Sequence, residues 1–265
     1  GLAAMVLLKN PSYLIFMLCS FLICIPLAFY YQLAFSTLRA AEVTDPAFKM
    51  TYGQISEIVF MLLMPFFFKR LGVKKMLLIG MLMWVVRYAL FALGTPDHVT
   101  WMLLIGVTVH GICYDFFFVT GQIYTDQTAP KEIRGQAQGL LVLFTLGLGM
   151  LIGAQIAGRV EAHYTPAEES TALNDEAKEL LDTIKDDTPE EEKKDLEAKA
   201  DALKVKALQL KDWQGIWAIP AGAAAVVMVL FVALFKEEEN EPAVESTSEG
   251  GTDGPEAGSN PDAGE

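Results

Sequence analysis

The chain has few of the residues that catalysis and metal binding use. Its 265 residues include three cysteines and three histidines. The cysteines lie inside apolar segments, which argues against a disulfide framework. The sequence contains no phosphate-binding loop, no dinucleotide fingerprint, and no cysteine or histidine cluster at metal-ligand spacing. We therefore expect no cofactor, no metal site and no enzymatic activity.

Charge is missing from long stretches of the chain. The sequence is 52% hydrophobic, and a membrane-spanning helix needs about 20 mostly apolar residues. The second qualifying stretch carries Gln54 and Glu57 in its first turns. The sequence thus predicts an all-α membrane protein with six transmembrane helices, at roughly 12–38, 51–68, 74–94, 99–125, 134–158 and 214–235.

Lysine and arginine are distributed unevenly among the short loops. Residues 69–75 contain four bases and no acid, residues 131–134 add two bases, and residues 94–98 contain neither lysine nor arginine. Because loops rich in lysine and arginine stay in the cytoplasm, the first two loops should be cytoplasmic and the third external. We expect a multi-pass protein of the cell inner (plasma) membrane with both termini in the cytoplasm.

Most charges gather in two regions outside the predicted spans. Residues 164–212 should form an extracytoplasmic loop between the first five helices (12–163) and the last one (213–235). Its helices are expected near 174–185 and 189–210, the second capped by Thr188. Residues 236–265 have almost no large apolar side chains, which predicts a disordered acidic tail. These regions supply much of the net charge of −13, so the charge identifies no ligand, and we expect no nucleic-acid partner.

One acid breaks the apolar pattern of the fourth span. Asp115 lies in the middle of the stretch from 99 to 124, where an ionised carboxylate costs roughly 3 kcal/mol on insertion scales. Such a group usually serves a proton relay, an ion pair or a polar substrate. The alternative is that Asp115 pairs with a buried base such as Arg87 and only locks helices together.

Other polar side chains share helix faces inside the spans. Gln54 and Glu57 are three residues apart, and His110 and Tyr114 are four apart, so each pair faces one way. Together with Arg87 on another span, they predict a polar cavity inside the bundle. The alternative is a set of scattered structural hydrogen bonds.

These segments resemble the nucleoside:proton symporters of the major facilitator superfamily. The matching runs are Gln54 with Ile55-Ser56-Glu57, Pro65-Phe66-Phe67-Phe68, Gly72-Val73-Lys74-Lys75, Arg87-Tyr88-Ala89-Leu90-Phe91-Ala92-Leu93-Gly94, Tyr114-Asp115-Phe116-Phe117, Ile133-Arg134-Gly135-Gln136-Ala137-Gln138-Gly139 and Asp212-Trp213-Gln214-Gly215-Ile216-Trp217.

The resemblance implies one half of a major facilitator bundle. The chain would be the C-terminal half, with residues 1–11 as the end of the central cytoplasmic linker. A missing N-terminal half, a separate half-bundle or a second copy would complete it. The implied function is secondary active transport of a small polar solute, most simply proton-coupled nucleoside uptake across the lipid bilayer. The alternative is a non-transporting membrane scaffold or sensor.

The resemblance also implies residue roles. Positions matching Gln54 and Glu57 contact the nucleoside, and His110 and Tyr114 lie in the same pocket. The amide of Gln54 and the carboxylate of Glu57 could hydrogen-bond to ribose hydroxyls, which need such partners once they are desolvated.

The proton-coupling role falls on the position of Asp115. Burial favours its neutral form and a base such as Arg87 favours the charged form, so the carboxyl could load and release a proton. Phe118, like Tyr114, could stack on a nucleobase.

The sequence departs from the family pattern at three positions. An amide pair of the family aligns with Ala28 and Tyr31, and His110 replaces a phenol. These departures put nucleoside selectivity in question. The loop 164–212 is longer than the family pattern requires.

Overall fold

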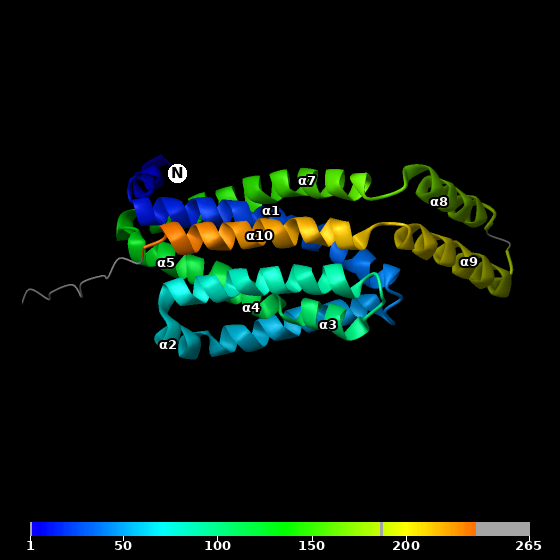
Figure 1. Cartoon of the computed structure of the whole chain (residues 1–265), viewed down its shortest axis with the longest axis horizontal. Coiled ribbons are helices and arrows are strands. Elements are labelled where there is room, and N and C mark those ends of the chain that lie inside the picture. The colour runs from blue at the N-terminus through cyan, green and yellow to red at the C-terminus, as the bar shows by residue number, and fades with distance from the viewer. Residues whose placement is uncertain (1, 186–187, 237–265) are drawn as a thin grey trace, which may run out of the picture.

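The computed structural model describes residues 2–185 and 188–236, and this part of the chain consists of helices joined by short turns. The predicted disordered tail lies outside the described residues, apart from Lys236. The helices form an elongated bundle (Figure 1). η1 (Leu2–Lys9) lies at one end, and α8 (Ala167–Asp182) and α9 (Glu190–Gln209) project from the other.

The described residues contain five helices that are long and apolar enough to cross a membrane. They are Pro11–Ala40, Pro46–Gly94, Thr100–Thr128, Lys131–His163 and Trp213–Leu234. The first is α1 and the last is α10. α1 begins at Pro11, close to the predicted start of the first span near residue 12. The Asn10 side chain caps it by accepting a hydrogen bond from the Tyr13 amide at 3.0 Å, and Pro11 occupies the first turn.

The second of these helices, α2 (Pro46–Gly94), combines the predicted second and third spans. Gly72 interrupts it with φ 70°, a left-handed conformation that glycine adopts without a steric penalty. The chain reverses there into two legs, 46–71 and 73–94 (Figure 1). The first leg starts at Pro46, so Gln54 and Glu57 lie beyond its first two turns and not at its start. The chain crosses the membrane six times only if each leg of α2 spans it. The six crossings therefore stay a prediction.

The turn at Gly72 lies at the same end of the bundle as the end of α10 (Trp213–Leu234) (Figure 1). The Lys74 ammonium donates a 2.9 Å hydrogen bond to the Phe235 carbonyl. A cation at this position stabilises the last carbonyls of a helix. One contact therefore connects the basic turn to the end of the last span.

The third and fourth long helices are each built from several pieces. Thr100–Thr128 contains α3 (Thr100–Thr108), α4 (His110–Tyr114), the π-helix η2 (Asp115–Val119) and α5 (Thr120–Thr128). Lys131–His163 contains η3 (Lys131–Ile133), α6 (Arg134–Val142), the π-helix η4 (Leu143–Gly149) and α7 (Met150–His163). Because π-helical turns often occur at functional sites, the position of Asp115 at the start of η2 is informative.

Glycines bring η4 and α7 close to α1. A Cβ at Gly149 would lie 2.8 Å from the Cβ of Cys24, and one at Gly153 would lie 2.8 Å from the Cβ of Ala28. Close helix packing is thus the role of these two glycines. Gly147 meets only its own helix.

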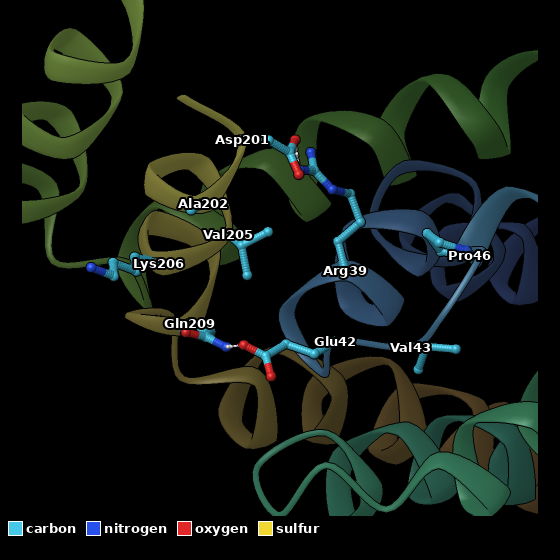
Figure 2. Close-up of a pocket in the computed structure, with 9 residues that line it drawn as sticks. All are labelled: Arg39, Glu42, Val43, Pro46, Asp201, Ala202, Val205, Lys206 and Gln209. Atoms are coloured by element: carbon cyan, nitrogen blue, oxygen red, sulfur yellow. Dashed lines mark hydrogen bonds and ion pairs between the residues drawn. The ribbon is translucent and has the colours of Figure 1, made fainter. Parts of the chain in front are cut away.

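The α8–α9 hairpin is docked on the bundle through the end of α1. Arg39 forms an ion pair with Asp201, and Gln209 donates to the Glu42 carboxylate at 3.1 Å, beside a pocket of about 400 Å³ (Figure 2). Asp201 and Gln209 belong to α9, whereas Arg39 lies in the last turn of α1 and Glu42 just after it. These contacts therefore hold the hairpin against the end of α1.

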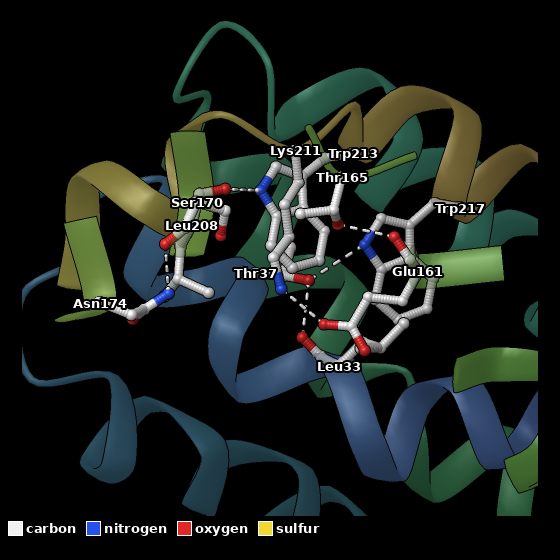
Figure 3. Close-up of polar contacts among 10 residues, drawn as sticks. All are labelled: Leu33, Thr37, Glu161, Thr165, Ser170, Asn174, Leu208, Lys211, Trp213 and Trp217. Carbon is white, nitrogen blue, oxygen red and sulfur yellow. Dashed lines mark hydrogen bonds and ion pairs between the residues drawn. The ribbon is translucent and has the colours of Figure 1, made fainter. Parts of the chain in front are cut away.

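Further polar contacts fix the start of α10 and the segment before it to α9, α1 and α7 (Figure 3). The Trp213 indole donates to the Leu208 carbonyl at 2.8 Å, and the Trp217 indole donates to the Thr37 hydroxyl at 3.0 Å. Lys211 pairs with Glu161 at 2.5 Å. The two tryptophans of the family-like segment 212–217 thus hold the start of α10 between α9 and α1.

Two sequence predictions about this hairpin were wrong. α8 begins at Ala167, seven residues before the expected start, because the stretch from Ala167 already consists largely of helix-forming residues. α9 begins at Glu190 without a side-chain cap. The Thr188 hydroxyl instead accepts from the Lys185 amide at 2.8 Å, within the turn between the two helices.

Candidate functional site

The candidate site is built where the first leg of α2 crosses α4. Nε2 of His110 lies 3.7 Å from Oε2 of Glu57, with side-chain exposures of 11% and 28%. This distance exceeds a hydrogen bond, and the contact is an ion pair when the imidazole is protonated. The two polar side chains that the sequence placed on different spans therefore meet.

A close backbone crossing sets this contact. The Gly111 amide donates to the Ser56 hydroxyl at 2.8 Å, and that hydroxyl donates to the Gly53 carbonyl at 3.0 Å. A Cβ at Gly111 would lie only 2.4 Å from the carbonyl carbon of Ser56. Because Gly111 follows His110 and Ser56 precedes Glu57, this crossing holds the imidazole beside the carboxylate.

Two aromatic side chains extend the contact along the fourth span. The Tyr114 ring lies 5.7 Å from the His110 ring, and the buried Phe118 ring lies 4.9 Å from Tyr114. Glu57, His110, Tyr114 and Phe118 thus form one continuous series of contacts. Gln54 is exposed on α2 one turn before Glu57 and makes no hydrogen bond to another described side chain.

Sequence reasoning missed Tyr30 as a member of this site. Its ring, which is 4% exposed, stacks on the His110 ring with centroids 5.4 Å apart and an interplanar angle of 19°. The only signal in the sequence was a pair of tyrosines shortly after Pro26 in an apolar span. Their spacing alone could not say which of Tyr30 and Tyr31 faces inward; Tyr31 is 57% exposed.

Arg87 is fully buried and does not pair with Asp115 within the described residues. Its Nε donates to the Gly106 carbonyl at 2.8 Å, and its guanidinium carbon lies 3.7 Å from the centroid of the Tyr30 ring. Neither terminal nitrogen has a hydrogen-bond partner there. The alternative in which Arg87 and Asp115 lock helices together is therefore wrong for this conformation.

Asp115 is also fully buried, at the start of η2. Neither of its carboxylate oxygens has a hydrogen-bond partner among the described residues. A buried charge without a partner is strongly disfavoured, so this environment favours the neutral acid.

The departures from the family pattern have a structural explanation in one case. Ala28 is buried where α1 touches Gly153 of α7. A longer amide side chain at this position would have little room beside that helix crossing. Tyr31, the second departure, lies on the exposed side of α1.

No metal centre is evident in the part of the chain that the structure describes. It contains no group of three or more histidine, cysteine, aspartate or glutamate side chains that could hold an ion. Cys19, Cys24 and Cys113 are buried free thiols.

A helical membrane bundle with buried ionisable groups inside its spans is typical of membrane transporters. Residues 1–177 match the family described as nucleoside H+ symporter, so the chain belongs to that family. It is a multi-pass inner-membrane protein of a transporter family, and not of an enzyme family.

Named relatives agree with this assignment. The putative nucleoside transporter YegT of Escherichia coli (strain K12) is 36% identical over 244 residues, which cover 91% of this chain and 49% of YegT. The nucleoside permease NupG of the same organism is 28% identical over 248 residues, which cover 89% of this chain and 49% of NupG. A crystal structure of NupG superposes with a TM-score of 0.64 at 28% identity, over 90% of this chain and 51% of that one. The chain spans about half the length of the curated relatives that it matches.

Proposed function

We propose that this chain supplies half of a proton-coupled nucleoside transporter. The observation that carries the proposal is the fully buried, unpartnered carboxyl of Asp115, on the span that presents His110 to Glu57. A family of nucleoside H+ symporters needs a group that exchanges a proton inside the membrane. Asp115 meets the physical requirements for that group.

The nucleoside would bind along the series of contacts from Glu57 to Phe118. Glu57 and Gln54 supply acceptors and donors for ribose hydroxyls, and His110 lies beside Glu57. Tyr114 offers a ring face for a nucleobase, because stacking on an aromatic ring is favourable for any base, and the buried Phe118 ring packs against Tyr114.

A second half-bundle would complete the binding cavity. Superfamily transporters bind their substrate near the midplane, between two halves that rock about the site. The exposure of Gln54 and Tyr31 within apolar spans supports a second bundle that covers this face. That bundle is an N-terminal half of the same protein, a separate chain or a second copy.

The proposed orientation places the basic turn 69–75 in the cytoplasm and the hairpin 164–212 outside. The positive-inside rule supports this assignment. Because the ends of η1 and α10 lie at the same end of the bundle as the turn (Figure 1), both termini would be cytoplasmic.

Binding of a radiolabelled nucleoside to the assembled transporter in nanodiscs tests the substrate assignment. We expect Glu57→Gln to weaken binding roughly fivefold to tenfold, because a hydrogen bond to a charged group is replaced by one to a neutral amide. Glu132→Gln, at an exposed acid in η3, is the matched control and should bind like the parent. Equal binding by both variants would remove Glu57 from the site.

A further inference from the structure

Tyr30 connects the buried cation to the candidate site. Arg87 lies over its ring at 3.7 Å, and the His110 ring stacks on it at 5.4 Å. Phe91 adds a third contact, with ring planes within 1° of parallel at 6.2 Å. Cation–π and stacked contacts with these geometries are attractive and fix the orientation of the ring.

Arg87 also holds the backbone that carries His110. α3 ends at Thr108 and α4 begins at His110, so the helix is interrupted at Val109. Gly106, which accepts the Nε hydrogen bond of Arg87, lies four residues before His110. In an uninterrupted α-helix that carbonyl would accept from the amide of residue 110. A side-chain donor at this interruption stabilises the local backbone.

The burial of the Arg87 guanidinium in this helix interface is energetically unfavourable by itself. A fully buried guanidinium with two unpartnered terminal nitrogens is disfavoured, and an apolar side chain would pack there without that penalty. The cation is balanced here by the Tyr30 ring and the Gly106 carbonyl. The Tyr30 ring stacks on the His110 ring, and the Gly106 carbonyl lies four residues before His110 in the same span.

We propose that Tyr30 and Arg87 are positioning residues that fix the His110 imidazole against Glu57. Tyr30 holds the ring of His110 by stacking, and Arg87 holds both Tyr30 and the backbone before His110. Neither residue contacts the nucleoside; both act through His110. The inference rests on the proposed function for its biological meaning, but the geometry that it predicts is measurable without transport.

Acylation of His110 by diethylpyrocarbonate tests the inference directly. In a background with His98→Gln and His163→Gln, His110 is the single imidazole of this chain. We expect Tyr30→Leu to raise its acylation rate roughly threefold to tenfold, the equivalent of one lost stacking contact. Tyr30→Phe keeps the stacked ring and should keep the parent rate. Phe231→Leu removes a buried aromatic ring from α10, away from His110, and controls for general loosening.

Arg87→Met supplies a second variant, with similar length and no charge. It should also raise the acylation rate, and it carries the test if Tyr30→Leu does not fold. Parent-like rates in Tyr30→Leu or, if that variant does not fold, in Arg87→Met would overturn the inference. So would an equal rise in Phe231→Leu.

Nucleoside binding to the same variants separates this inference from the proposed function. Weaker binding in Tyr30→Leu, with rescue in Tyr30→Phe, supports both. If the parent binds no nucleoside but the acylation rates change as expected, the proposed function fails and the positioning role stands. If the parent binds nucleoside but the acylation rates do not change, the positioning role fails alone.

Discussion

The crossing of α2 and α4 predicts a large penalty for the smallest possible change at Gly111. In Gly111→Ala the added Cβ would lie 2.4 Å from the Ser56 carbonyl carbon and 2.6 Å from the Glu57 amide nitrogen. Ordinary contacts of a Cβ begin at 3.4 Å. These atoms belong to the backbone of a helix and cannot rotate away, so the two helices must separate by about 1 Å, roughly the shortfall at the tightest contact.

This separation has a calculable consequence. Overpacking of a tight interface costs about 1–3 kcal/mol, and the hydrogen bond from the Gly111 amide to Ser56 is strained as well. For a chain of this size, 1 kcal/mol corresponds to about 2–4 °C in melting temperature. We therefore expect Gly111→Ala to melt about 2–12 °C below the parent in detergent.

Gly139→Ala is the matched control. A Cβ at Gly139 meets nothing within 4 Å, so this variant should melt with the parent, or slightly above it because alanine favours the helix. Tryptophan fluorescence during heating gives the melting temperatures of the parent, Gly111→Ala and Gly139→Ala. Equal melting temperatures for the two alanine variants would refute the close crossing, and with it the reason why His110 reaches Glu57.

Three further predictions test the ends of the bundle. Lys74→Met removes the hydrogen bond to the Phe235 carbonyl. Amide hydrogen exchange at the end of α10 should therefore speed up about fivefold, the equivalent of about 1 kcal/mol. Lys75→Met is the control and should leave this exchange rate unchanged. Trp217→Phe keeps one aromatic ring but removes the N–H donor to the Thr37 hydroxyl and part of a buried ring system. The melting temperature should fall by at least about 2–4 °C, whereas an unchanged value would show that neither the bond nor the lost packing contributes. An impermeant maleimide added to intact cells should label Glu190→Cys but not Lys74→Cys, over a low background because the native cysteines are buried; the reverse pattern would invert the proposed topology.

The general fold was predictable because the bilayer imposes simple rules on a sequence. Long apolar windows located the helices of membrane-spanning length, including the first one, which begins at Pro11, close to the predicted start near residue 12. The boundaries of α8 could not be located, because its polar composition gives no apolar run, only helix propensity. The conformation of Gly72 lets the chain reverse between the two legs of α2, a reversal that the basic loop 69–75 suggested without fixing which residue makes it.

The site was predictable only within single helices. Spacing placed His110 and Tyr114 on one face, as it placed Gln54 and Glu57. Which faces meet depends on the crossing at Gly111, a tertiary contact that no local pattern encodes. For the same reason the sequence suggested an ion pair between Arg87 and Asp115, whereas the structure directs Arg87 toward Tyr30.

Asp115→Asn tests the proposal that the Asp115 carboxyl couples proton movement to nucleoside transport. The amide keeps the size and much of the hydrogen-bonding capacity of the acid but cannot titrate. In proteoliposomes that contain the assembled transporter, we expect this variant to lose uphill nucleoside uptake driven by a pH gradient. It should retain exchange of labelled for unlabelled nucleoside, because exchange needs no net proton movement. If the variant still concentrates nucleoside in proportion to the pH gradient, Asp115 is structural and the coupling group lies elsewhere, with Glu57 the next candidate.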